Sequence, residues 1–156
     1  MPKVLLIEDD PIVCRVYSQF LGANGFSVVT ARDGATGFEI LCTDRPDAVI
    51  LDLMLPKLSG LKVLSAIKAD QGLRTLPILV FTAAHVPSLV GEAIKLGANR
   101  VFDKTNTKPI AVTQFLHDLL GTSCDAATAV LSNSGSIETR MNATAKQPQG
   151  LRIPIE

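Results

Sequence analysis

The chain has 156 residues, a formal net charge of zero and a hydrophobic share of 47%. This length fits one domain with an appendage, and the apolar content is sufficient for a core. A neutral chain gives no support for a nucleic-acid surface, which needs clustered Lys and Arg. No apolar run is long enough for a membrane span, and three scattered cysteines fit a reducing compartment. We therefore expect a cytoplasmic protein that binds neither membrane nor nucleic acid directly.

Apolar runs alternate with helix-like segments from residue 3 to about residue 120. Residues 4–7 are a continuous apolar run, and apolar residues at helical spacing over 12–22 predict the first helix. The same alternation then recurs along the chain. The further strands are expected at 26–31, 48–51, 78–81 and 101–102, and the further helices at 35–42, 61–67, 86–96 and 107–120.

This alternation predicts the fold class. Strands that are apolar throughout indicate a sheet covered on both faces. Five strands alternating with five helices predict right-handed crossovers and a doubly wound parallel sheet of the α/β class. We assign residues 1–121 to this domain. Residues 122–156 are rich in Ser, Thr and Ala, which is typical of a tail or linker, although this segment could also dock on the domain or on a partner.

Polar side chains follow four of the apolar runs. Glu8 and Asp9 follow the first, Asp52 follows the third, Thr82 ends the fourth and Lys104 follows the fifth. Parallel strands end at the same edge of a sheet, which is where such sheets bind ligands. Each residue alone would be explained as a helix cap, a turn residue or a surface charge. Their joint occurrence at one edge therefore carries the functional signal.

The chemistry of this set points to phosphoryl transfer. Crowded carboxylates repel one another, and Mg²⁺, which prefers oxygen ligands, relieves that repulsion. A carboxylate can be the nucleophile in covalent phosphoryl transfer, with a metal and a Lys neutralising the transferred charge. Pro56 and Gly60 predict a tight loop between Asp52 and the next helix. We therefore expect a Mg²⁺ site and phosphoryl transfer to a carboxylate at this edge of the sheet.

The chain resembles the receiver domain of bacterial two-component response regulators over about residues 3–121. The matching stretches are 5–11, 49–56 with Gly60, 80–84, 97–98 and Lys104. The resemblance implies a flavodoxin-like fold with strand order 2-1-3-4-5. It also implies a signalling protein that catalyses only its own phosphorylation and dephosphorylation. The implied partners are a sensor histidine kinase or histidine phosphotransfer protein, a downstream protein target or output domain, and a second copy in a homodimer.

The resemblance also implies a role for each residue at the strand ends. Asp52 would be the phosphoacceptor, with Lys104 pairing with the phosphoryl group and Thr82 supplying a switch hydroxyl. Asp9 would bind Mg²⁺ directly and Glu8 mainly through water. The remaining implied roles are a metal-binding carbonyl at Met54, a small residue at Ala83 that leaves the phosphoryl group accessible, and a capping or outer acid at Asp10.

Two positions depart from the family pattern. Thr105 follows Lys104, where the family has a Pro joined by a cis peptide. A cis bond to a residue other than Pro costs about 2.5–4 kcal/mol, so we expect a trans peptide and a rearranged loop. Val101 stands where the family has an aromatic switch residue, and strand alternation points the neighbouring Phe102 to the other face. This argues against coupled movement of Thr82 and an aromatic side chain.

Three other functions fit parts of the pattern. An aspartyl phosphatase needs a second acid two residues after its nucleophile, where this chain has Met54. A flavodoxin-like cofactor binder would have a Ser, Thr and Gly-rich loop after the first strand, where this chain has acids. A degenerate receiver that serves as a protein-binding scaffold would lack the acceptor or the Lys, and both are present. The scaffold is the alternative that we keep.

Overall fold

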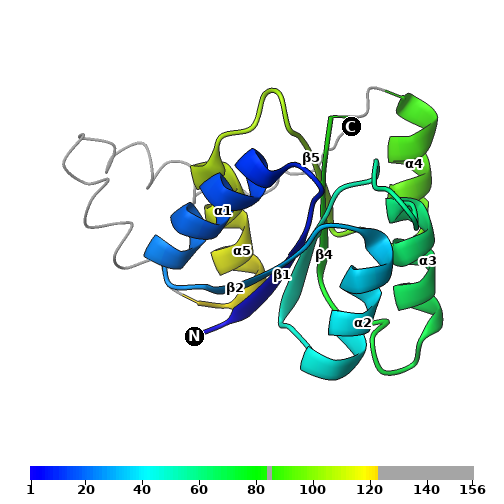
Figure 1. The fold of residues 1–156 in the computed structure, drawn as a ribbon, viewed down its shortest axis with the longest axis horizontal. Coiled ribbons are helices and arrows are strands. Elements are labelled where there is room, and N and C mark those ends of the chain that lie inside the picture. Colours follow the sequence, from blue (N-terminus) through cyan, green and yellow to red (C-terminus); the bar gives the residue numbers. More distant parts are fainter. Residues whose placement is uncertain (84–85, 123–156) are drawn as a thin grey trace. The chain divides into compact units, whose positions relative to one another are not determined.

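The fold of the protein is an alternation of strands and helices (Figure 1), seen in a computed structural model that describes residues 1–83 and 86–122. The strands are β1 (Lys3–Ile7), β2 (Ser27–Ala31), β3 (Ala48–Leu51), β4 (Ile78–Thr82) and β5 (Arg100–Asp103). The helices are α1 (Pro11–Ala23), α2 (Gly34–Asp44), α3 (Gly60–Ala69), α4 (Pro87–Lys95) and α5 (Pro109–Leu120). The expected alternation is confirmed, with no element end shifted by more than two residues.

The strands form one sheet in the order β2-β1-β3-β4-β5, and every neighbouring pair is parallel. Helices α1 and α5 cover one face of this sheet, while α2, α3 and α4 cover the other (Figure 1). This is the doubly wound arrangement that the sequence predicts. Because all strands run the same way, their carboxyl ends lie along a single edge.

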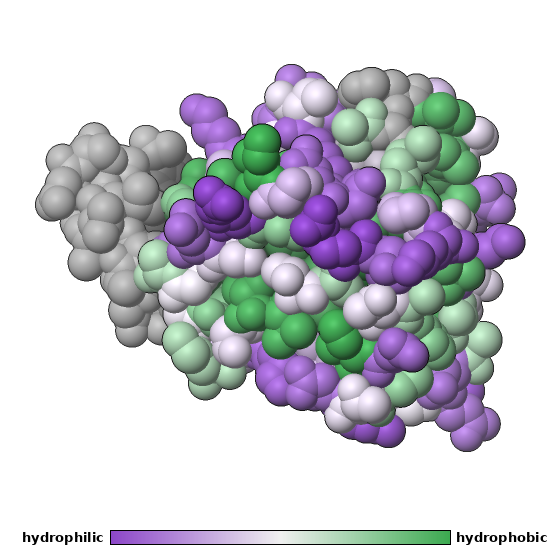
Figure 2. All heavy atoms as spheres, viewed as in Figure 1, coloured by the Kyte–Doolittle hydropathy of each residue, from purple (hydrophilic) through white to green (hydrophobic). Residues whose placement is uncertain are grey.

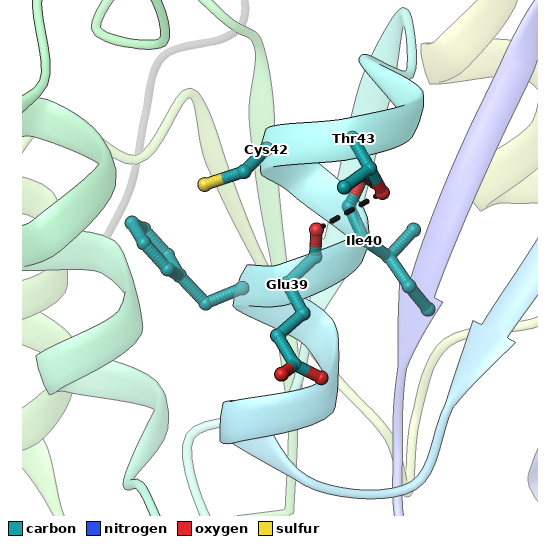
Figure 3. A pocket seen from close by; sticks show the side chains of 5 residues that line it. Glu39, Ile40, Cys42 and Thr43 are labelled. Atoms are coloured by element: carbon teal, nitrogen blue, oxygen red, sulfur yellow. Dashed lines mark hydrogen bonds between the residues drawn. The ribbon is translucent and has the colours of Figure 1, made fainter.

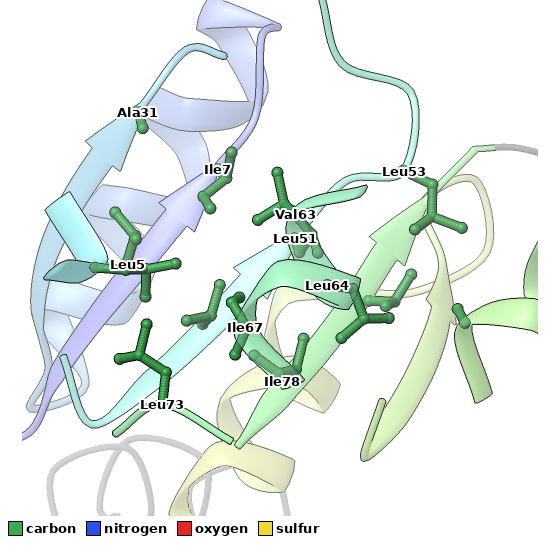
Figure 4. Packing of buried hydrophobic residues seen from close by; sticks show 14 residues of the cluster. Leu5, Ile7, Ala31, Leu51, Leu53, Val63, Leu64, Ile67, Leu73 and Ile78 are labelled. Atoms are coloured by element: carbon green, nitrogen blue, oxygen red, sulfur yellow. The ribbon is translucent and has the colours of Figure 1, made fainter. Parts of the chain in front are cut away.

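Each face of the sheet packs against its helices through a separate apolar cluster. On the side of α3, Leu5 and Leu51 pack with Leu64 and Ile67, and none of these four side chains is exposed (Figure 4). The other cluster joins residues of β1, β3 and β4 to α1 and α5. Burial of residues 4–7 in β1 and of all of β3 explains why these sequences are apolar at successive positions rather than at alternating ones.

The last strand confirms the predicted alternation of side chains. Val101 packs against the cluster on the side of α3, and Phe102 belongs to the cluster on the side of α5. Within residues 1–83 and 86–122 no peptide bond is cis, so the Lys104–Thr105 bond is trans as expected. A Lys-Pro pair occurs later in the chain, at Lys108-Pro109, where Pro109 lies in the first turn of α5.

The described part of the chain ends just after α5. Gly121 follows this helix in the left-handed conformation, with φ of 68°, which is a common helix end. Residues 123–156 lie outside the described residues, so the domain boundary at residue 121 and the docking of the tail stay predictions.

Among the described helices, none has the length and apolar character needed to cross a membrane. Figure 2 shows hydrophilic residues across the middle of one face and hydrophobic residues below them.

Gly60 controls how closely α3 approaches the end of β3. A Cβ atom at this position would lie 2.2 Å from the carbonyl oxygen of Asp52 and 2.5 Å from Cα of Leu53. The amide of Gly60 donates a hydrogen bond of 3.1 Å to the Leu53 carbonyl. The bare backbone of Gly60 therefore lets the loop after Asp52 close tightly, as the sequence predicts.

We expect Gly60→Ala to destabilise the domain by about 1–3 kcal/mol, because the new methyl group overlaps backbone that has little freedom to move. Chemical denaturation measures this change. Gly91→Ala is the matched control, since Gly91 lies in α4 with open space around its Cβ position. This control should raise stability by roughly 0.5–1 kcal/mol through helix propensity. Equal stability of the two variants would contradict the assigned role of Gly60.

Candidate functional site

Lys104 lies at the centre of a charged cluster on the carboxyl edge of the sheet. Its amide donates to the Thr82 carbonyl at 3.1 Å, which extends the pairing of β5 with β4 by one residue. Its ammonium nitrogen lies 2.8 Å from Oδ2 of Asp52 and 2.5 Å from Oε1 of Glu8. Glu8 is fully buried and Asp52 is 3% exposed. One ammonium group therefore bridges two carboxylates that have little contact with solvent.

The loop after β1 presents a second carboxylate beside Glu8. Glu8, Asp9 and Asp52 each offer a carboxylate oxygen, and these oxygens lie within 4.8 Å of one another. Asp9 is exposed, so this side of the cluster is open to solvent. Asp10 caps α1 by accepting from the amide of Ile12 at 2.8 Å, so it is not part of the group. Three convergent carboxylates are a donor set that fits a hard cation such as Mg²⁺ or Mn²⁺.

Burial and pairing act in opposite directions on the charges of this cluster. Burial raises the pKa of Glu8, and the hydrogen bond from Lys104 opposes this rise without cancelling it. Burial alone would lower the pKa of Lys104, but the hydrogen bonds to Asp52 and Glu8 outweigh it and hold that pKa above its usual value. Lys104 therefore stays an ammonium ion at neutral pH. Three carboxylates facing one ammonium leave a net negative charge once all are ionised.

Asp52 is held from two sides. Its Oδ2 accepts from Lys104, and its Oδ1 accepts a hydrogen bond of 3.1 Å from the Met54 amide. The Asp52 amide donates to the Ile7 carbonyl at 3.1 Å, which ties the residue to the end of β1. These bonds fix the orientation of the carboxylate at the sheet edge. Met54 has a largely exposed side chain, and the metal-binding role of its carbonyl stays a prediction.

Thr82 ends β4 at the same edge of the sheet. Its side chain is 2% exposed, and its position lies opposite Asp103 in the pairing of β4 with β5. Ala83, the next residue, is exposed. Glu8, Asp9, Asp52, Thr82 and Lys104 therefore all lie at the edge to which the sequence assigns them.

Sequence reasoning missed Asp103, which organises the loop after β5. Its Oδ1 accepts from the amide and the hydroxyl of Thr105, at 2.9 Å and 2.7 Å, and its Oδ2 accepts from Nδ2 of Asn106 at 2.7 Å. An Asp whose side chain binds the amide two residues ahead is a common turn former. The Asp-x-Thr-Asn pattern was the available signal in the sequence.

An open apolar hollow lies away from this edge, on the surface of α2. Its lining comes from the single helix: Phe38, Glu39, Ile40, Cys42 and Thr43 (Figure 3). The Thr43 hydroxyl donates a hydrogen bond of 3.1 Å to the Glu39 carbonyl oxygen. None of the residues that form the charged cluster contributes to the hollow.

Residues 4–116 match the response regulator receiver domain family. The chain belongs to this family. Among curated relatives, the response regulator MprA of Mycolicibacterium vanbaalenii is 36% identical over 114 residues, which is 73% of this chain and 47% of that protein. MprA of Mycobacterium avium is 35% identical over the same extent. The chain therefore spans about half the length of these relatives.

Solved receiver structures share the fold of this chain. The receiver domain of a sensor histidine kinase from Pseudomonas aeruginosa, with magnesium coordinated in its active-site cleft, is 26% identical with a TM-score of 0.71. That match covers 78% of this chain and 98% of the other. The chemotaxis response regulator CheY4 of Vibrio cholerae is 27% identical with a TM-score of 0.70, covering 77% and 99%. The Mn²⁺-bound response regulator Rcp1 is 25% identical, with a TM-score of 0.70 and coverage of 79% and 97%.

We expect Lys104→Met, in buffer free of divalent cations, to destabilise the receiver by about 3 kcal/mol at pH 7.5, because two buried carboxylates lose their counter-charge. Removing Lys104 raises the pKa of Glu8 further. A folded-state pKa above the unfolded value favours folding at low pH, so the deficit should shrink as pH falls through that raised pKa. Urea denaturation at pH 5 and pH 7.5 measures both effects.

Lys62→Met serves as the control for this substitution, since Lys62 is exposed on α3. It should change the free energy of unfolding by no more than about 0.5 kcal/mol at either pH. A pH-independent deficit in Lys104→Met would contradict the account of paired buried charges.

Proposed function

We propose that this receiver domain is cytoplasmic and accepts a phosphoryl group on Asp52 from a sensor histidine kinase or histidine phosphotransfer protein, with Mg²⁺ as cofactor. The main support for this proposal is that the Lys104 ammonium lies 2.8 Å from the Asp52 carboxylate. Glu8 and Asp9 offer further carboxylate oxygens beside it. Family membership and the metal named in the Pseudomonas aeruginosa structure support the same reading.

The residues of the cluster divide the work of the transfer. A carboxylate oxygen of Asp52 forms a bond to phosphorus while the bond from phosphorus to the donor nitrogen breaks, and the electron pair stays on that nitrogen. Glu8, Asp9 and Asp52 would hold the cation, with the Met54 carbonyl as a further ligand. When bound, the cation neutralises negative charge on the phosphoryl oxygens.

Lys104 and Thr82 would serve the phosphorylated form. In the resting domain Lys104 pairs with Asp52 itself, and a phosphoryl oxygen can take the place of that carboxylate oxygen. The Thr82 hydroxyl lies at the adjacent strand end, where it would donate to a second phosphoryl oxygen. Because Met54 carries no acid, the chain has no proton donor two residues after Asp52, which favours holding the phosphoryl group over rapid hydrolysis.

The output of the domain is a change in its contacts with another protein. The relatives are about twice as long as the matched region, so the recipient is either a separate protein or an output domain outside the matched region. Homodimer formation is a further form of output. Val101 packs on the opposite face of the sheet from Phe102, so we do not expect Thr82 to move together with an aromatic side chain at position 101.

We expect beryllofluoride with Mg²⁺ to form an adduct at Asp52, and acetyl phosphate with Mg²⁺ to add one phosphoryl group, seen by ¹⁹F NMR and intact mass. Asp52→Asn should show neither, because the amide is a poor nucleophile. Asp118→Asn is the matched control, since Asp118 is exposed in the last turn of α5. Absence of an adduct in the wild-type protein, together with unchanged partner binding in Asp52→Asn, would instead support the phosphorylation-independent scaffold.

We expect Mg²⁺ at ten times its dissociation constant to stabilise the wild-type domain by about 1.4 kcal/mol in thermal or urea denaturation. Asp9→Asn should lose this stabilisation, while folding normally in metal-free buffer because Asp9 is exposed. Asp10→Asn is the control on the adjacent acid. It should keep the full response, because Asn caps a helix as well as Asp does and Asp10 faces the amides of α1. Loss of the response in Asp10→Asn but not in Asp9→Asn would reverse the ligand assignment.

A further inference from the structure

The loop from β5 to α5 is built around one residue. Asp103 accepts five hydrogen bonds from the three residues that follow Lys104: three on its carboxylate, from Thr105 and Asn106, and two on its carbonyl, from the amides of Asn106 and Thr107. The donors span residues 105–107. Lys104 therefore lies within a turn in which residues 105–107 donate hydrogen bonds back to Asp103.

This turn determines where the backbone of Lys104 lies. On one side the Lys104 amide is bonded to the Thr82 carbonyl, and Asp103 pairs with Thr82 in the sheet. On the other side, the bonds from Thr105 to the Asp103 carboxylate form a turn directly after β5, which ends at Asp103. The Lys104 side chain is a flexible four-carbon stem, so the position of its ammonium beside Asp52 and Glu8 depends in part on where the backbone of residue 104 lies.

The turn is incompatible with the usual family residue after this Lys. It uses the Thr105 amide and hydroxyl as donors, and Pro has neither an amide hydrogen nor a hydroxyl. With a trans bond between Lys104 and Thr105, the loop takes its shape from side-chain hydrogen bonds instead of from a proline ring. The Thr at position 105 and the acid at position 103 therefore form one structural unit.

We propose that Asp103 is a positioning residue for Lys104, and that its turn holds the ammonium group against Asp52 in place of the family's Lys-Pro arrangement. This inference rests on the proposed phosphoryl-accepting function. In this scheme Asp103 does not contact Asp52 or the phosphoryl group, and it acts on the phosphoryl site through residue 104. Its effect should therefore vanish when Lys104 is absent.

A double-mutant cycle with beryllofluoride as probe tests this inference in the full chain with saturating Mg²⁺. We expect Asp103→Ala to raise the dissociation constant of beryllofluoride about ten- to hundredfold, because small displacements of a catalytic group have effects of this size. In the Lys104→Ala background the same substitution should change it less than about twofold, since interacting residues are not additive. Mg²⁺ affinity, measured without beryllofluoride, should not weaken in Asp103→Ala.

Two further variants separate the hydrogen bonds from charge and from general destabilisation. Asp103→Asn keeps an acceptor for both donors of Thr105, so it should restore most of the affinity lost in Asp103→Ala. Asp118→Ala removes an equally charged side chain from the exposed end of α5 and should leave the affinity unchanged. Equal losses from Asp103→Ala with and without Lys104, or a matching loss of Mg²⁺ affinity, would overturn the inference.

A readout without any phosphoryl analogue distinguishes failure of this inference from failure of the proposed function. In metal-free protein the ¹³Cγ resonance of Asp52 reports its contact with Lys104. Asp103→Ala should move this resonance toward its position in Lys104→Ala, and Asp103→Asn should leave it near the wild-type position. An unmoved resonance in Asp103→Ala overturns the inference even if wild-type protein binds beryllofluoride. A moved resonance with no adduct in wild-type protein supports the inference and rejects the proposed function.

Discussion

The ammonium group of Lys104, held between Glu8 and Asp52, is the interaction on which the rest of the site depends. Two carboxylates with almost no solvent contact would be costly to keep ionised without a counter-charge. The parallel sheet supplies the geometry, because the ends of β1, β3 and β5 lie along one edge. The tight entry of α3 at Gly60 then closes the loop against Asp52 without a side chain in the way. The fold therefore brings the charges of this cluster together and also provides the counter-charge that the buried carboxylates need.

The charge balance also explains why the resting site is suited to a cation and, after it, a phosphoryl group. One ammonium does not neutralise Glu8, Asp9 and Asp52 together, so a residual negative charge faces the open side at Asp9. In the proposed function a divalent cation would reduce that charge, and a phosphoryl group on Asp52 would add negative charge at a new position. Lys104 could then pair with a phosphoryl oxygen in place of the Asp52 oxygen that it contacts here.

Much of this arrangement could be predicted from the residues, for identifiable reasons. Strands β1, β3 and β4 each contain a continuous apolar run of four residues because both sheet faces are covered, so the polar residues at the ends of these runs stand out in the sequence. The separation of Val101 from Phe102 follows from strand alternation alone. The Asp103 turn was not predictable in the same way, because it depends on side-chain hydrogen bonds between neighbours that resemble ordinary surface residues. The observed end of α2, at Asp44, also differs from the expected end at residue 42, because the last turn of a helix is only weakly specified by sequence.

The sheet order has a consequence for when the site comes into being. Lys104 and Asp52 are 52 positions apart, and β4 lies between their strands in the sheet. During synthesis, the half of the chain that carries Glu8 and Asp52 emerges first, before the residue that neutralises them exists. Any nascent or truncated chain that ends before β5 therefore carries the acids without their lysine. The charged cluster is therefore complete only after β5 and Lys104 have been synthesised and have joined the sheet.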